Sequence, residues 1–430
     1  MGGIVLEICN TGLCTVCGIC AGVCPQQCIK MSLKDGKPTP EISAERCTNC
    51  GICKKVCPQS EFDYKKYSSS SNNFWFGNYK KLFKAQSQDE SLLKMATSGA
   101  IVTQLVKNLL EDKVYDCVFT VGTYSHREVS QAERFDGAEF LKRTPKSRYV
   151  MISHENTVKY MMKNKDVSLI IVATPCVLHG LTKVIELFQL KRDNYLFIGL
   201  FCDKTMTNKV FFYFENIFGD SSGKLDQIYF RTKEVGGWPG GVRLFWEDGQ
   251  ITDLSNKERT KVKEYYQPEG CMYCIDKVNY LADISVGDNY ADSDADIKGS
   301  SSVILRSETA VKIWERYKDY FNFELETEEK IFNAQKLGDR EKNLVYADYK
   351  GISYNLPENV IVKSGKNYKR DYRKALKKIN DGMHKEYKYV YRKSRYRYKK
   401  LLSLFYGVLG NLKKAAMECR SRKKMRKGNN

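Results

Sequence analysis

Residues 167–202 read VSLIIVATPCVLHGLTKVIELFQLKRDNYLFIGLFC, and this stretch decides the fold of the larger part of the chain. Two largely apolar runs, Val167–Ala173 and Tyr195–Phe201, flank a segment with helical spacing. Continuous apolar runs predict strands that are buried on both faces, so we expect a βαβ unit with parallel strands. Cys176 and Cys202 follow the two runs. Because ligands bind at the carboxyl ends of strands in open α/β sheets, both thiols are predicted to lie at the functional edge.

The α/β pattern extends outward over residues 76–350, which we interpret as one domain with a partly parallel sheet. Apolar residues recur at helical spacing over 100–110, and a strand is predicted over Asp116–Val121. A further strand is predicted over Ala282–Val286.

The N-terminal region, residues 1–62, contains the cysteine motif C-x2-C-x2-C-x3-C-P twice. This spacing is typical of ferredoxins that hold two 4Fe–4S clusters, in which the fourth cysteine of each motif ligates the other cluster. The predicted ligand sets are Cys14, Cys17, Cys20 and Cys57 for one cluster, and Cys47, Cys50, Cys53 and Cys24 for its partner. Zinc is the alternative, but it prefers four N or S ligands in paired C-x2-C knuckles, and the chain has only four histidines.

Between the two motifs, residues 29–33 and 37–42 predict a short hairpin around the turn at Asp35-Gly36. We therefore expect an α+β ferredoxin-like module. The polar stretch that follows, residues 63–75, is predicted to be a linker.

A candidate third cluster site combines four cysteines of the α/β domain. A C-x2-C pair precedes the predicted strand 282–286, and its thiols are candidates to join the two at the strand ends. The set is Cys176, Cys202, Cys271 and Cys274. The alternative is that Cys176 and Cys202 are buried small hydrophobic residues, as most isolated cysteines are.

Composition places the chain among globular proteins of a reducing compartment. It has 430 residues, of which 42% are apolar, and sixteen cysteines without a signal-peptide pattern, so we expect a cytoplasmic protein. No stretch reaches the roughly 18 uncharged apolar residues that a membrane span needs.

The positive charge is concentrated at the C-terminus. Residues 361–430 contain 24 Lys and Arg but four Asp and Glu, whereas the preceding 360 residues contain 47 of each kind. We interpret residues 351–430 as a basic, helical tail. The apolar run 401–412 between lysine pairs favours an anionic membrane surface on the inner face of the membrane over nucleic acid; a solvated helical extension is the alternative.

Several short segments resemble the beta-subunit family of coenzyme F-420 hydrogenases and dehydrogenases. The matching segments are 97–99, 173–181, 199–202, 230–233 with 237–238, 271–276 and 282–288. The resemblance implies FAD and iron–sulfur clusters, and electron transfer between a deazaflavin or another two-electron partner and one-electron carriers. The family usually carries a second glycine where Ala100 stands.

Residues 97–99 are the first candidate flavin contact. Ser98 and Gly99 open an apolar-periodic helix, whose free amide groups and positive dipole end can hold a phosphate. The alternative is an ordinary helix cap. The resemblance favours phosphate binding by Thr97, Ser98 and Gly99.

The other candidate flavin contacts lie at strand ends. Thr174 and Pro175 can shape the flavin edge, and Arg231 and Lys233 can offset charge on a reduced flavin. Solvated surface cations are the alternative for the last two. Asp288, at the end of a predicted buried strand, is a further contact or a residue that closes a turn.

The predicted function is an FAD-dependent iron–sulfur oxidoreductase. Cubanes move one electron and hydride donors two, so a flavin belongs at the junction. Single electrons are expected to run between the flavin, the third cluster and the paired clusters, and no side chain is assigned as a catalytic acid or base. A redox partner protein or a reduced coenzyme is expected. The alternatives are a non-catalytic electron carrier and a membrane-docked adaptor associated with polysaccharide biosynthesis.

Overall fold

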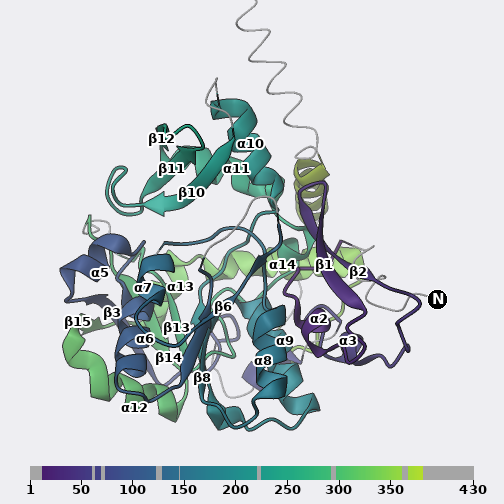
Figure 1. The fold of residues 1–430 in the computed structure, drawn as a ribbon, viewed down its shortest axis with the longest axis horizontal. Coiled ribbons are helices and arrows are strands. Elements are labelled where there is room, and N and C mark those ends of the chain that lie inside the picture. The colour runs from purple at the N-terminus through teal and green to yellow at the C-terminus, as the bar shows by residue number, and fades with distance from the viewer. Residues whose placement is uncertain are drawn as a thin grey trace, which may run out of the picture.

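An eight-stranded mixed sheet forms the centre of the molecule (Figure 1). The computed structural model describes residues 12–60, 63–68, 73–122, 128–144, 146–219, 224–291, 297–360 and 367–380. The strand order is β15 (Phe321–Leu325), β3 (Lys81–Ser87), β14 (Ser301–Leu305), β13 (Ile284–Asp288), β9 (Tyr195–Leu200), β8 (Leu169–Ala173), β4 (Cys117–Thr120) and β6 (Glu133–Phe135). The four strands β13, β9, β8 and β4 are parallel, and the remaining pairings are antiparallel. The prediction of a partly parallel sheet is therefore confirmed.

The βαβ unit predicted from 167–202 is present as β8, α9 (Pro175–Leu187) and β9. The two strands pair in parallel, with Leu169 opposite Tyr195 and Ala173 opposite Gly199. All five residues of β8 are buried, because helices cover both faces of the sheet at this point. The parallel register brings the ends of β8 and β9 to the same edge.

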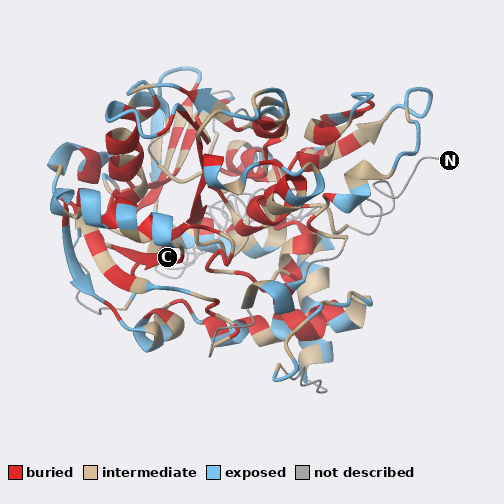
Figure 2. Cartoon of the chain, turned by 90° about the horizontal axis from the view of Figure 1, so that it is seen from below, coloured by how far each residue is buried: buried red, intermediate tan, exposed pale blue. Residues whose placement is uncertain are grey.

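Alternate residues of each central strand enter two different cores. Ile170 and Val172 pack with α6 (Ile101–Glu111) and α12 (Glu308–Tyr317), whereas Leu169 and Ile171 pack with α8 (Glu155–Lys163) and α9. This follows from the period of two along a strand. Figure 2 shows the buried residues concentrated in the sheet and on the helix faces that turn toward it.

The N-terminal module consists of α2 (Ile19–Val23), the hairpin β1 (Ile29–Lys34) and β2 (Lys37–Ile42), and α3 (Ile52–Lys55). The predicted hairpin is confirmed. Ile19 and Val23 belong to the same core as α8 and α9, so the module packs directly on the sheet domain. Gly22 permits this approach, because a Cβ atom there would lie 2.5 Å from Val158 Cβ and 2.9 Å from the Glu155 carbonyl oxygen.

The stretch predicted as a linker, residues 63–75, contains packed residues. Tyr64–Ser68 forms α4, and Tyr64 and Phe74 are buried in one cluster with Tyr280. The aromatic residues on either side of the polar run explain the difference, since each offers a large apolar surface to bury. Residues 69–72 of the expected linker lie outside the described residues.

A smaller lobe lies beside the main sheet and has its own core (Figure 1). It contains α10 (Lys209–Phe218), the antiparallel strands β10 (Leu225–Thr232), β11 (Gly241–Trp246) and β12 (Ile251–Leu254), and α11 (Asn256–Tyr266). The range 76–350, predicted from the sequence as one unit, therefore includes a second, separate sheet that belongs to this lobe.

The remaining elements connect these parts. They are α5 (Glu90–Met95), β5 (Ser130–Gln131), α7 (Phe140–Arg143), β7 (Ile152–Ser153), α13 (Glu328–Ala334), α14 (Glu341–Lys350) and four short 3-10 helices.

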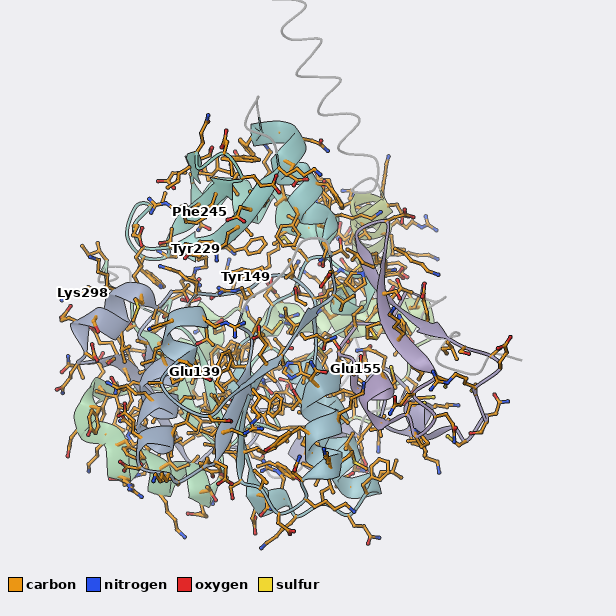
Figure 3. All side chains as sticks on the ribbon, viewed as in Figure 1. Glu139, Tyr149, Glu155, Tyr229, Phe245 and Lys298 are labelled. Atoms are coloured by element: carbon orange, nitrogen blue, oxygen red, sulfur yellow. The ribbon has the colours of Figure 1, made fainter. Side chains whose placement is uncertain are left out.

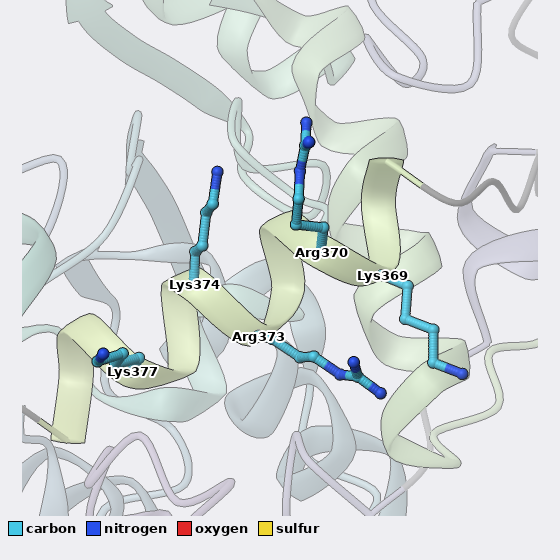
Figure 4. A pocket seen from close by; sticks show the side chains of 5 residues that line it. All are labelled: Lys369, Arg370, Arg373, Lys374 and Lys377. Atoms are coloured by element: carbon cyan, nitrogen blue, oxygen red, sulfur yellow. The ribbon is translucent and has the colours of Figure 1, made fainter.

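Of the predicted tail 351–430, residues 351–360 contain no helix and residues 367–380 form one. Its Tyr372 and Leu376 pack against Tyr346 and against the loop that carries Met272 and Tyr273. Basic side chains point away from the helix, as Figure 4 shows for Lys369, Arg370, Arg373, Lys374 and Lys377. Residues 381–430, and with them the apolar run 401–412, lie outside the described residues. Within the described ranges, every helix is too short or too polar to cross a bilayer.

Candidate redox site

The structure brings the first predicted ligand set of the N-terminal module together. One small cavity is lined by Cys14, Cys17, Cys20 and Cys57. Burial raises the pKa of Cys57 to about 11, and burial together with the charges of neighbouring thiols raises the pKa of Cys17 and Cys20. Gly18 follows the second cysteine with φ of 75°, which turns the chain into α2 and places Cys20 on its first turn.

The second set lies at the outer end of the module. Burial raises the pKa of Cys53, and the charges of Cys50 and Cys24 add to this. Cys50 is exposed, and Gly51 repeats the left-handed turn of the first motif with φ of 74°. Cys28, which belongs to neither predicted set, is buried with its Sγ atom 3.3 Å from Cys24 Sγ.

The four later cysteines converge from three segments. Cys176 lies in the first turn of α9, Cys202 follows β9, and Cys271 and Cys274 lie in and after the 3-10 helix Glu269–Met272. Burial raises the pKa of all four thiols, that of Cys271 to about 12, and the charges of neighbouring thiols add to this at Cys202, Cys271 and Cys274. All four line one larger cavity.

Arg340 and Asn343 hold two of these cysteine loops in place. Arg340 donates from Nη2 to the Cys202 carbonyl oxygen at 3.2 Å and from Nη1 to the Cys274 carbonyl oxygen at 3.2 Å. Asn343 Nδ2 donates to the same Cys274 oxygen at 2.6 Å. Neither residue is predicted from the sequence. Arg340 and Asn343 lie 66 and 69 residues after Cys274, in a segment whose pattern predicts only an ordinary amphipathic helix.

The donor sets fit iron–sulfur clusters better than a single ion. Within the described ranges, no group of three or more His, Cys, Asp or Glu side chains is placed to share one metal ion. Thiolates of a 4Fe–4S cluster each bind a different iron atom, so such a site does not need that close convergence. Each predicted ligand set consists of thiolates alone, and iron–sulfur clusters prefer thiolate ligands.

Cys17 connects the N-terminal module with the later thiols. The charge of Cys176 is among the causes that raise the Cys17 pKa, after burial and the charges of Cys57 and Cys20. Thr15 lines both the small cavity and the larger one. The Cys17 carbonyl oxygen accepts a hydrogen bond from the His154 amide at 2.8 Å, which fixes the module against α8. The first ligand set therefore lies next to the later thiols.

The larger cavity has a volume of about 590 Å³, within the usual range of ~300–1,000 Å³ for ligand pockets. It extends from the four thiols along the carboxyl ends of β8, β9 and β13 to the first turn of α6. Six of the eight predicted flavin contacts line it: Thr97, Ser98, Thr174, Pro175, Arg231 and Asp288. The other two, Gly99 and Lys233, do not line the cavity.

Arg231 and Asp288 form a buried pair in the cavity wall. Two Arg231 nitrogens donate to the two Asp288 oxygens at 2.5 and 2.9 Å, and Trp238 Nε1 donates to Asp288 Oδ1 at 3.1 Å. Burial alone would raise the Asp288 pKa, but the charge and hydrogen bonds of Arg231 outweigh it, and the pKa lies below its usual range. Asp288 is thus an acceptor that orients Arg231, which is more than the closing of a turn.

Arg231 and Lys233 hold the loop Thr97–Gly99 through its carbonyl groups. The Thr97 carbonyl oxygen accepts from Arg231 Nη2 at 3.2 Å, and the Ser98 carbonyl oxygen accepts from Lys233 Nζ at 2.7 Å. Lys233 also donates to the Leu93 carbonyl oxygen at 2.7 Å, so it supports the loop. The structure adds this supporting role to the interpretation of Lys233, and its contact with a flavin stays a prediction.

Amides without a partner within the helix lie slightly later in the chain than the predicted pair Ser98-Gly99. The Gly99 amide donates to Ser301 Oγ at 3.0 Å and is not available to a phosphate. The first bond within α6 runs from the Gln104 amide to the Ala100 carbonyl oxygen, so the amides of residues 101–103, which line the cavity, have no partner within the helix. Ala100 precedes them with φ of 61° in the left-handed region.

The cavity wall carries an excess of positive charge. Its cations are Lys146, Arg148, Lys204, Arg231, Arg259, Lys263 and Lys277, against the acids Asp203 and Asp288. Burial lowers the pKa of Lys146 and Lys204, and that of Lys277 to about 8. Figure 3 shows Tyr149, another lining residue, between the lobe that carries Tyr229 and Phe245 and the main sheet domain.

Comparison with known families agrees with this arrangement. Residues 82–159 match the family model "Coenzyme F420 hydrogenase/dehydrogenase, beta subunit N-term", and residues 166–331 match the companion model for the C-terminal part of the same beta subunit. The chain belongs to this beta-subunit family. Residues 13–60 match a 4Fe-4S dicluster domain, so the protein is an iron–sulfur member of an oxidoreductase family. The resemblance seen in the sequence is confirmed.

Individual relatives of this family member are distant. The coenzyme F420 hydrogenase subunit beta of Methanosarcina barkeri is 24% identical over 247 residues, which cover 56% of this chain and 80% of that protein. The coenzyme F420-dependent sulfite reductase of Methanocaldococcus jannaschii is 26% identical over 71% of this chain, which spans only 46% of that protein. A solved structure of the F420-reducing [NiFe] hydrogenase complex from Methanosarcina barkeri aligns with 64% of this chain and 91% of the matched chain, at a TM-score of 0.46 and 20% identity.

Proposed function

We propose that the protein is an FAD-dependent oxidoreductase that passes electrons between a two-electron substrate in the larger cavity and one-electron carriers. The observation that supports this most is the shape of the cavity, which extends from the Arg231–Asp288 pair to the four thiols of Cys176, Cys202, Cys271 and Cys274. The two N-terminal sets and this third set would hold three 4Fe–4S clusters.

The residues around the cavity suit a flavin nucleotide. The amides of residues 101–103 would hold a phosphate at the start of α6, and Thr174 and Pro175 would lie along the ring system at the end of β8. When bound, FAD exchanges two electrons with organic substrates and single electrons with iron–sulfur clusters. Arg231 would face the ring with its charge kept in place by Asp288.

The protein's own contribution is to position charges and to exclude water. Burial of the Cys202 and Cys274 thiols raises their pKa, so bare thiolates are unfavourable there and ligation to iron would supply the missing positive charge. Cys176 lies beside Cys17, which favours the later site as the neighbour of the first N-terminal cluster. The exposed Cys50 marks the outer end of the series, where a redox partner protein can approach.

The relatives support a partner protein, since two of them are named as subunits of a hydrogenase. Sixteen cysteines suit a reducing cytoplasm. We also propose that the basic face of helix 367–380 contacts an anionic membrane surface.

The test is an anaerobic reduction experiment on the full chain with its clusters and flavin. Reduced coenzyme F420, NADH and NADPH are each mixed with the protein, and the iron–sulfur absorbance is followed. We expect at least one donor to bleach the clusters, with about one donor molecule consumed per two cluster electrons. Bleaching by dithionite but by none of the three hydride donors would contradict the proposal.

A further inference from the structure

Arg259 lies in the part of the cavity wall that the lobe contributes. It belongs to α11, is only 6% exposed, and donates from Nη2 to Asn256 Oδ1 at 2.6 Å. Its guanidinium group lies over the Tyr149 ring, 4.7 Å from the ring centre. The Nε donor is buried and has no hydrogen-bond partner. Buried donors are nearly always paired, so Arg259 keeps the capacity to donate to a further acceptor.

The acids of the cavity wall are bound by cations other than Arg259. Of the two acids in the cavity wall, Asp288 is bound by Arg231, and Asp203 is bound by Lys263 and by Arg340. No ion pair joins Arg259 to an acid in the described part of the chain.

We infer that Arg259 anchors a subsite for an anionic group, a phosphate or a carboxylate, of the molecule bound in the cavity. Arginine suits this role because its planar group keeps its charge and can donate two parallel hydrogen bonds to such an anion. The Tyr149 ring below holds the guanidinium plane in position. The inference rests on the proposed function, because the anion belongs either to the FAD diphosphate or to the two-electron substrate.

The test compares Arg259→Gln with a matched control, Arg243→Gln, in the anaerobically purified full chain. Arg243 lies on β11 of the same lobe, pairs with Asp253 at 2.7 Å and does not line the cavity, so both variants remove one charge from the same lobe. FAD and riboflavin are titrated into flavin-free protein by fluorescence. Inorganic pyrophosphate is titrated into FAD-loaded protein by calorimetry.

Two results support the subsite and identify its source. If Arg259→Gln weakens FAD binding at least about tenfold and leaves riboflavin binding unchanged, the anion is the cofactor phosphate. If FAD binding is unchanged and pyrophosphate binding to the loaded protein weakens by that factor, the anion belongs to the substrate. Arg243→Gln should stay within about twofold of the wild type in every titration.

The inference is overturned if FAD, riboflavin and pyrophosphate all bind Arg259→Gln as they bind the wild type. Arg259→Lys keeps the charge but lacks the Nε donor, so it should recover part of the lost affinity. Such a recovery would show that the loss in Arg259→Gln does not come from misfolding. If the wild type binds no flavin, the proposed function fails. The subsite is then tested by comparing pyrophosphate binding to the flavin-free wild type and to flavin-free Arg259→Gln.

Discussion

The eight N-terminal thiols and the four later ones form two kinds of site. The first eight come from two short runs, 14–24 and 47–57, in which spacing alone sets the loop geometry. The later four come from positions as far apart as Cys176 and Cys274, and only the parallel register of β8 and β9, with a clamp from Arg340, brings them together. A locally encoded site should tolerate changes in the rest of the fold, whereas an assembled site should depend on contacts between segments that are far apart in sequence.

The largest effect is expected for Cys274→Ala, which removes one sulfur from the assembled site. Loss of a residue that only supports a ligand costs ~10–100-fold, so loss of the ligand itself should slow electron transfer from the cavity to the N-terminal clusters by more than ~100-fold. Stopped-flow absorbance after mixing with a hydride donor measures this rate. Cys117→Ala is the control, because Cys117 is buried at the amino end of β4, whereas Cys176 and Cys202 follow the carboxyl ends of β8 and β9. Equal rates in both variants would remove the later thiols from the route.

Arg340→Gln should weaken the assembled site without touching a sulfur atom. The change removes three carbonyl contacts and the pair with Asp203, so we expect iron at this site to be bound ~10–100-fold more weakly. Iron release to a chelator, followed by absorbance, should show a faster phase for about one third of the iron, the share of one cluster in three. The rate of iron release from Arg340→Lys should lie between the rates for Arg340→Gln and the wild type. Faster release of all the iron would show that the two kinds of site are not independent.

Gly22→Ala tests the packing of the module on the sheet domain. The added methyl group would meet Val158 Cβ and a backbone oxygen of α8, and overpacking of this kind costs ~1–3 kcal/mol. Urea unfolding of the anaerobic protein measures the free energy of unfolding. Gly137→Ala is the control, since no atom lies within 4 Å of the place that its methyl group would take. A stability equal to that of the control would mean that the module does not pack closely on α8.

Ala100→Gly should have the smallest effect, and it should raise the free energy of unfolding, whereas Gly22→Ala lowers it. Ala100 has φ of 61°, which costs an alanine ~1–2 kcal/mol, and part of the gain is offset by the greater freedom of glycine in the unfolded chain. We expect stability to rise by about 0.5–1 kcal/mol in the same urea experiment. A loss of stability would show that the methyl group contributes packing that outweighs the backbone strain.

The sequence predicts the local features well and the assembled ones only in part. Apolar runs and cysteine spacing locate β8, β9 and the two motifs, because each depends on neighbours in the chain. The lobe with β10–β12 and the role of Lys233 are missed, since both depend on long-range packing: Lys233 supports the carbonyl groups of Leu93 and Ser98, which lie 140 and 135 residues earlier. The buried Tyr64 is missed because a polar run follows it.

The central claim is that three thiol sets and one flavin cavity form a connected series. Chemical analysis of iron, acid-labile sulfide and released flavin in anaerobically purified protein tests it most directly. We predict about twelve iron atoms, about twelve sulfides and about one FAD per chain. About eight iron atoms with no flavin would contradict the claim, because the locally encoded clusters would then stand alone beside an empty assembled site.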